Sequence, residues 1–168
     1  MALANAPSII SELNYSPPET DTGFDPEDPF TYIKRCIFPY LKNPNTITTN
    51  QTLITMKVDV KSTFNFKVNV ETTILVVCHQ DDMETSFGMV KTDYLAGEVR
   101  KVLFNIKDGT WLGDVNLVSD QETVIGDNHL ARALVFKMQD IDIGRFIQNG
   151  WYRTEIYTWV SICFTCYL

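Results

Sequence analysis

The feature that most constrains the fold is the alternation of residue types between Thr52 and Cys78. Of the fourteen even-numbered positions in this stretch, eleven are apolar, whereas most of the odd-numbered positions are polar. Successive side chains of an extended strand point to opposite faces, so a period of two places the apolar residues on one face. A helix would spread the same residues around its circumference. The stretch therefore predicts β-structure with one buried, apolar face and one solvent-exposed, polar face.

The polar residues Lys61–Thr63 divide this stretch in two. If they form a turn, Val60 faces Phe64 and the two halves pair as a hairpin with both apolar rows on the same face. If they do not turn, residues 52–78 form one long bent strand. Both arrangements are compatible with the sequence.

Several shorter segments also have the composition of strands, and polar loops are expected over residues 79–84 and 119–128. The clearest turn is Asp108-Gly109, because glycine readily adopts positive φ. Residues 129–139 could also form a helix with Leu130 and Leu134 on one face, but a strand is favoured. About eight strands with turn signals every 8 to 14 residues predict an all-β fold, an eight-stranded antiparallel β-sandwich of jelly-roll or Greek-key type. The additional strands are expected over residues 85–93, 98–106, 111–118, 129–139, 145–147 and 151–168.

Residues 1–29 differ from the rest of the chain in composition. They contain five prolines and six acidic residues but no Lys or Arg, a net charge of −6, whereas the remainder carries 14 basic against 15 acidic residues. Such a segment predicts a flexible arm, or one docked on or swapped with another chain, ahead of a single sandwich domain over residues 30–168. Its charge argues against nucleic-acid binding. We expect its deletion to leave a folded body but to impair assembly.

The sequence carries no recognisable catalytic motif. It contains no Gly-x-Ser-x-Gly elbow, no glycine-rich phosphate loop and no His-Glu-x-x-His, and its two histidines have no recognisable partners. Cys163 and Cys166 resemble a metal-binding pair, but three residues apart on a strand they point to opposite faces. The chain is therefore not expected to be an enzyme. It also lacks an 18-residue apolar run, so no membrane contact is expected.

One weak metal site can be suggested. Asp140 and Asp142 lie two residues apart and would place two carboxylates on the same side of an extended backbone. Such hard oxygen ligands suit Ca²⁺, particularly if Asp120, Glu122 or Asp127 joins them from a neighbouring loop. A solvated acidic loop is the simpler interpretation, and no other cofactor is expected.

The C-terminal residues are unusually aromatic. The chain has more aromatic residues than one sandwich core usually needs: Tyr152, Tyr157, Trp159 and Tyr167, with Trp111 and Trp151. Aromatic residues concentrate at protein interfaces as well as in cores. Residues 159–166 are apolar on both parities, as in a central strand or a surface buried against another chain. A place in the core is favoured, and the interface candidates are Trp151, Tyr157, Trp159 and Tyr167.

In overall organisation the chain resembles the small single-jelly-roll capsid subunits of picorna-like icosahedral viruses. The resemblance rests on the proline-rich arm (Ala6 to Pro29), the body from Thr52, and the final segment WYRTEIYTWVSICFTCYL. It implies a virion protein, assembled in the host cytoplasm, whose partners are copies of itself and sister subunits, with Ca²⁺ at subunit interfaces as an option. The acidic arm departs from the basic arm of many RNA-packaging subunits. The alternative function is a β-sandwich recognition module that binds carbohydrate or protein through loops and exposed aromatics.

Overall fold

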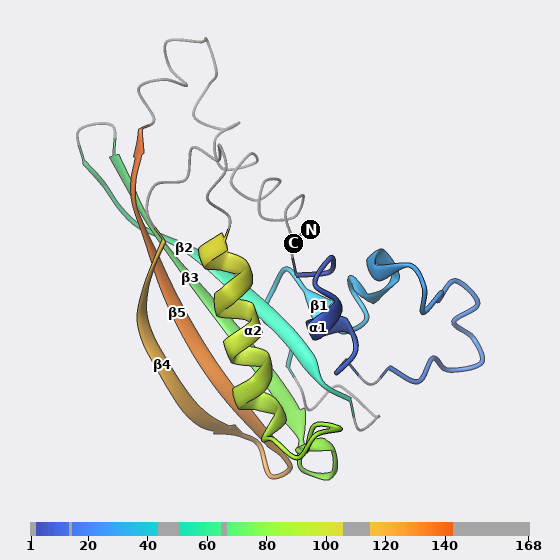
Figure 1. Cartoon of the computed structure of the whole chain (residues 1–168). Helices are drawn as coiled ribbons and strands as arrows, with labels where there is room; N and C mark the ends of the chain where they lie inside the picture. Colours follow the sequence, from blue (N-terminus) through green and yellow to red (C-terminus); the bar gives the residue numbers. More distant parts are fainter. Residues whose placement is uncertain (1–2, 14, 44–50, 65–66, 106–114, 143–168) are drawn as a thin grey trace.

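The computed structural model describes residues 3–13, 15–43, 51–64, 67–105 and 115–142. This part of the chain is mostly β, with one long helix (Figure 1). In chain order its elements are α1 (Pro7–Ile10), the 3-10 turn η1 (Pro29–Tyr32), β1 (Ile37–Phe38), β2 (Leu53–Phe64), β3 (Lys67–His79), the 3-10 turn η3 (Gln80–Asp82), α2 (Lys91–Asn105), β4 (Val115–Ile125) and β5 (His129–Asp142).

The strands form one mixed sheet in the order β1-β2-β3-β5-β4. β1 is parallel to β2, whereas the other neighbours are antiparallel. β2 and β3 form a long hairpin that extends beyond the end of α2, and α2 lies across one face of the sheet (Figure 1). Since β4 and β5 also pair as a hairpin, α2 leads from one hairpin to the other.

The main core lies between the sheet and its helical cover. The apolar row predicted from the alternation in β2 and β3 faces α2, which contributes apolar side chains at a spacing of three to four residues. The N-terminal residues fill the same layer beside α2. The fully or almost fully buried members of this core include Leu3, Ile9, Leu13, Ile54, Met56, Ile74, Val76, Leu95, Val99, Leu134 and Phe136.

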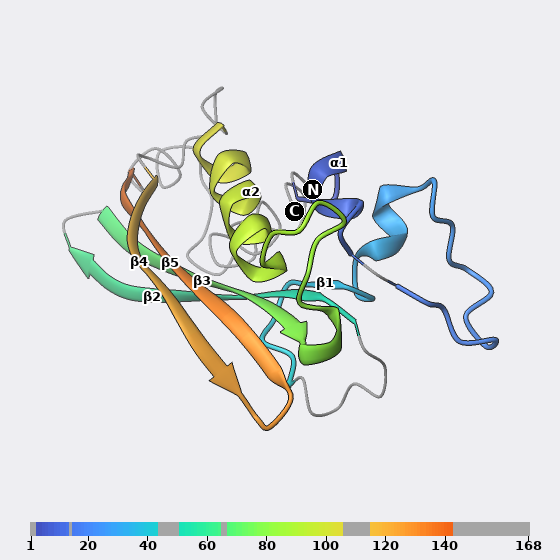
Figure 2. The ribbon, with the colours of Figure 1, turned by 60° about the horizontal axis from the view of Figure 1, so that its bottom comes forward.

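On the opposite face of the sheet, the described side chains form a small apolar cluster around Phe38. That side chain packs with Leu53, Val77 and Ala131. Among the described residues both α-helices lie on the other side of the sheet (Figure 2). Further along the hairpin this face is charged. It carries ion pairs such as that of Lys61 with Glu71, in which Nζ lies 3.1 Å from Oε1. The sheet therefore has one covered face and one largely polar face.

The eight-stranded jelly-roll sandwich is not confirmed. The described residues form a single five-stranded mixed sheet with helical cover on one face. The strand expected over residues 98–106 is wrong, because Leu95, Val99 and Leu103 form an apolar stripe with helical spacing and bury it on the sheet. The strand expected over residues 85–93 is a short loop and the first turn of α2, and the loop expected over 119–128 is mostly β4.

Other expectations are confirmed. Residues 129–139 are in β5, and the hairpin is the correct alternative for residues 52–78. Its turn does not lie at Lys61–Thr63, however, because β2 continues to Phe64. The register shifts between Val60 and Ser62, which shows that the polar interruption is a bulge in the strand and not its end. The expected turn at Asp108-Gly109 lies outside the described residues.

The N-terminal residues pack into the core of their own chain. Leu3, Ile9 and Leu13 are buried, and the Ser8 hydroxyl donates a hydrogen bond of 2.7 Å to Glu98 of α2. The pattern predicted a boundary between a flexible or swapped arm and the body near residue 30. In the structure, residues 3–13 are part of the body because they complete the apolar layer beside α2.

The acidic stretch after residue 15 forms a loop that projects from the body (Figure 1). Arg35 donates to Asp21 at 2.6 Å, and Tyr15 donates to the same carboxylate at 2.7 Å. The hydrogen bond from Arg35, aided by the one from Tyr15, holds the pKa of Asp21 well below its usual range. The Phe24 ring packs between the rings of Tyr15 and Tyr32. The loop is thus tied to the body by one ion pair and one aromatic cluster.

Candidate interaction surface

The segment Glu84–Val90, which we call the apolar loop, is a closed turn between η3 and α2. The Thr85 backbone N–H donates to the Met89 carbonyl at 2.8 Å, and the Met89 N–H donates to the Thr85 hydroxyl at 2.8 Å. Gly88 has a φ of 82°, which a residue with a side chain rarely adopts, and its N–H donates to the Thr85 carbonyl at 3.0 Å. The loop is therefore held by its own hydrogen bonds.

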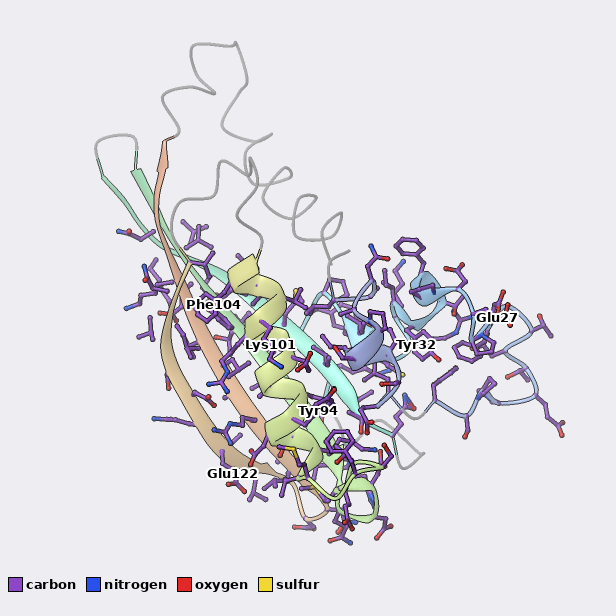
Figure 3. All side chains as sticks on the ribbon, viewed as in Figure 1. Glu27, Tyr32, Tyr94, Lys101, Phe104 and Glu122 are labelled. Carbon is purple, nitrogen blue, oxygen red and sulfur yellow. The ribbon has the colours of Figure 1, made fainter. Side chains whose placement is uncertain are left out.

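This loop presents three large apolar side chains to solvent. Phe87, Met89 and Val90 are 53%, 49% and 46% exposed. The Phe87 ring packs edge to face on Tyr94, with ring centroids 4.9 Å apart, and Tyr94 lies at the end of α2 nearest the loop (Figure 3). Because Phe87 is already ordered, binding through it would cost little conformational entropy.

A buried ion pair anchors the base of the apolar loop. Lys91, only 2% exposed, donates to the carboxylate of Asp82, and the Thr52 hydroxyl donates to the same carboxylate at 2.9 Å. The Lys91 backbone N–H donates to the Met83 carbonyl at 2.7 Å. These bonds join β2, η3 and α2 at one point and hold both ends of the loop in place.

The thiol beside this pair is unsuited to nucleophilic chemistry. Cys78 is fully buried and lies 3.5 Å from the Thr52 hydroxyl oxygen. Burial raises the pKa of Cys78 to about 12, so the reactive thiolate is scarce at neutral pH. The group of Thr52, Cys78, Asp82 and Lys91 is therefore a structural junction.

A second group of charges joins α2 to the edge hairpin. Asp120 of β4 accepts hydrogen bonds from Arg100 of α2 at 2.9 Å and from Arg132 of β5 at 2.6 Å. Arg132 also donates to Asp93 of α2. The two carboxylates and two guanidinium groups balance one another, so this network positions the helix and leaves no surplus negative charge for a cation.

The two histidines lie together at one end of the sheet. His79 and His129 are opposite each other in β3 and β5, with ring centroids 5.1 Å apart. His129 is buried, and its Nδ1 has no hydrogen-bond partner in the described part of the chain. The Asp81 carboxylate lies 3.4 Å from Nδ1 of His79. Burial, and to a lesser extent the neighbouring His79, lower the pKa of His129.

This pair predicts a pH dependence of stability. Because the folded-state pKa of His129 is lowered, its contribution is complete above an unfolded-state pKa of about 6.5 and is lost as the pH falls below that value. Wild-type protein should therefore lose more free energy of unfolding between about pH 7.5 and about pH 5 than the His129→Gln variant. Urea denaturation at the two pH values measures this, and equal losses would contradict it.

The structure does not test the Ca²⁺ pair expected at Asp140 and Asp142. Asp140 and Asp142 end strand β5, and their side chains lie outside the described part. Asp120, the nearest of the acidic residues expected to join them, is opposite Leu134, about 20 Å from Asp140 at about 3.3 Å per residue. At that separation Asp120 does not join Asp140 in one site, and the pair of Asp140 and Asp142 itself stays a prediction. Among the described side chains no group of three or more His, Cys, Asp or Glu is placed to hold a metal ion.

The predicted interface aromatics, Trp151, Tyr157, Trp159 and Tyr167, lie outside the described residues. Sequence reasoning missed the apolar loop instead, because residues 85–93 resemble a weak strand. One signal was present in the sequence: Phe87, Met89 and Val90 surround a glycine and do not alternate with polar residues. Such a run fits neither a half-buried strand nor an amphipathic helix.

Comparison with known proteins identifies a family but no individual relative. Within the described residues, no helix has the length and apolar character needed to cross a membrane. No curated protein and no solved structure matches the chain. The family model of YomW matches residues 6–138, more than three quarters of the sequence, and this range includes most of the N-terminal core segment, the hairpin, α2, β4 and most of β5. The chain therefore belongs to the YomW family.

Proposed function

We propose that this protein is a structural component of a virus particle and that it assembles with copies of itself. The observation that carries the proposal is the apolar loop, which holds Phe87, Met89 and Val90 half exposed on a fixed backbone. Clustered apolar side chains on a surface are typical of protein interaction sites, whereas single ones are common everywhere. YomW is a phage-type family, which supports a viral origin.

The charge of the chain favours protein over nucleic acid as the partner. The whole chain carries −7, and residues 1–29 account for −6 of this. Such a surface repels phosphate, so the particle contacts we propose are made between protein subunits. In its finer form the proposal is a capsid subunit located in the virion. The contacts that we infer for it are made by loops and do not depend on a jelly roll.

Light scattering on the purified full-length chain tests this function. We expect a species whose mass rises with protein concentration far above the 19.2 kDa of one chain. Moderate salt should promote this association, since it screens repulsion between acidic subunits. Electron microscopy of the same sample should then show regular particles. A chain that stays monomeric at every protein and salt concentration would overturn the proposal. Saturable binding of a foreign protein or carbohydrate by that monomer would favour a recognition module.

A further inference from the structure

The charge around the apolar loop is negative. Residues 80–91 contain Asp81, Asp82 and Glu84 against the single cation Lys91, a net charge of −2. Lys91 is buried on Asp82, so it does not offset the exposed Glu84 at the loop surface. A partner for this loop should therefore combine apolar side chains with positive charge.

The chain itself carries a surface with those properties. Residues 30–43 contain three basic residues and no acidic one, and of the three Arg35 is paired with Asp21. Within them Tyr40 and Leu41 are about half exposed, and the Lys42 ammonium lies 4.2 Å from the centroid of the Phe38 ring. We call Tyr40–Lys42 the basic patch. It offers two apolar side chains and a cation that is held next to them by the aromatic ring.

The two surfaces lie on opposite faces of the sheet. Phe87 of the apolar loop packs on Tyr94 of α2, the helix that covers one face (Figure 2). Tyr40 packs on Phe38, which belongs to the apolar cluster of the other face. A single chain therefore cannot bring its own loop onto its own patch, but two chains can meet through them.

We propose that the apolar loop of one copy packs against the basic patch of the next copy. This inference rests on the proposed self-assembly and names the surfaces that make it. The contact is head-to-tail, because each copy contributes a different surface to its two neighbours. Repetition of such a contact produces a closed ring when the rotation closes and a helical filament when it does not.

Charge reversal on either surface tests the contact. In Glu84→Lys the loop meets Lys42 with like charge, and in Lys42→Glu the patch meets Glu84 with like charge. Each variant alone should associate about tenfold more weakly than wild type in sedimentation velocity at low salt. Both sites are on the surface, and circular dichroism checks that the fold is retained. Glu27→Lys, which makes the same change of charge in the projecting N-terminal loop (Figure 3), is the matched control and should associate like wild type or better.

Mixing the two variants gives the decisive measurement. In an alternating arrangement the lysine introduced at position 84 of one chain meets the glutamate introduced at position 42 of the other. The remaining contact pairs the original Glu84 with the original Lys42. We therefore expect an equimolar mixture of Glu84→Lys and Lys42→Glu chains to recover wild-type association, although neither does so alone. Phe87→Ser should weaken association about tenfold even at high salt, whereas Val124→Ser, at an exposed valine of β4, should not.

The outcomes separate this inference from the proposed function. If wild-type protein associates but both charge-reversal variants associate equally well, this contact is wrong and self-assembly stands. If both variants are impaired and their mixture does not recover, the two surfaces do not meet each other. If wild-type protein never associates, the proposed function and this contact are both overturned.

Discussion

Replacing Asp82 by alanine should lower the free energy of unfolding by about 3–5 kcal/mol. The Asp82 carboxylate accepts hydrogen bonds from the Lys91 ammonium and the Thr52 hydroxyl, and Lys91 is only 2% exposed. Without Asp82 an ammonium group remains buried without its counter-charge, and this desolvation penalty exceeds the worth of the pair itself. Urea denaturation followed by circular dichroism measures the difference.

Two further variants make this prediction specific. Asp81→Ala changes the neighbouring carboxylate, whose side chain is mostly exposed, and should cost less than about 1 kcal/mol. The double variant Asp82→Ala/Lys91→Met removes both charges and should recover much of the loss, because no unpaired charge stays buried. An Asp82→Ala protein as stable as Asp81→Ala would show that the buried pair does not hold this junction.

Replacing Ile9 by alanine should lower the free energy of unfolding by about 2–5 kcal/mol. Ile9 is fully buried in the main core, where the N-terminal segment packs beside α2. Shortening its side chain therefore leaves a cavity. The adjacent Ile10 is only partly buried, and Ile10→Ala should cost about 1 kcal/mol or less. Urea denaturation of both variants measures the contrast.

The same comparison tests where the N-terminal residues belong. If they were a flexible or exchanged arm, Ile9→Ala and Ile10→Ala would have similarly small effects on an isolated chain. If they complete the core, removing residues 1–13 removes Leu3, Ile9 and Leu13 together, a loss comparable with the whole stability of a domain of about 5–15 kcal/mol. A chain shortened by these residues is therefore no longer expected to keep a folded body.

The sequence pattern predicted the strands whose two faces have different environments. Positions from Ile54 to Val76 alternate because one side of the hairpin packs under α2 and the other carries charges such as Lys57. The strand over residues 129–139 was also predicted, although it is buried on both faces at Ala131 and Leu134. In both cases the residue types match the pleated backbone that they occupy.

The helix could not be predicted from short-range alternation. Val102 and Phe104 suggest a strand, but Leu95, Val99 and Leu103 lie on one side of a helix, and only the presence of a sheet beneath them decides between the two patterns. The burial of Leu3, Ile9 and Leu13 was missed for a similar reason. The prolines and acidic residues of the N-terminal stretch lie mainly after Leu13, so the average composition of residues 1–29 concealed a short apolar segment.

The candidate interaction surface could not be predicted from the sequence pattern, for a different reason. Exposure of Phe87 depends on a turn whose hydrogen bonds are made by Thr85 and whose backbone requires Gly88. A sequence of seven residues does not reveal that this turn closes on itself or that Lys91 is buried on Asp82 beneath it. The aromatic residues of the C-terminal segment attracted attention because their number was unusual, whereas the exposed phenylalanine of the loop was a single residue.

The placement of the N-terminal segment has a consequence for how the protein forms during synthesis. Ser8 is hydrogen-bonded to Glu98, 90 residues later, and the core around Ile9 also includes Phe136 of β5. The apolar side chains of the N-terminal segment are therefore not covered until α2 and β5, which are synthesised much later, are also available. Contacts between residues so far apart in the sequence slow folding and leave apolar surfaces exposed on the growing chain. This core is thus expected to form only after β5 has left the ribosome.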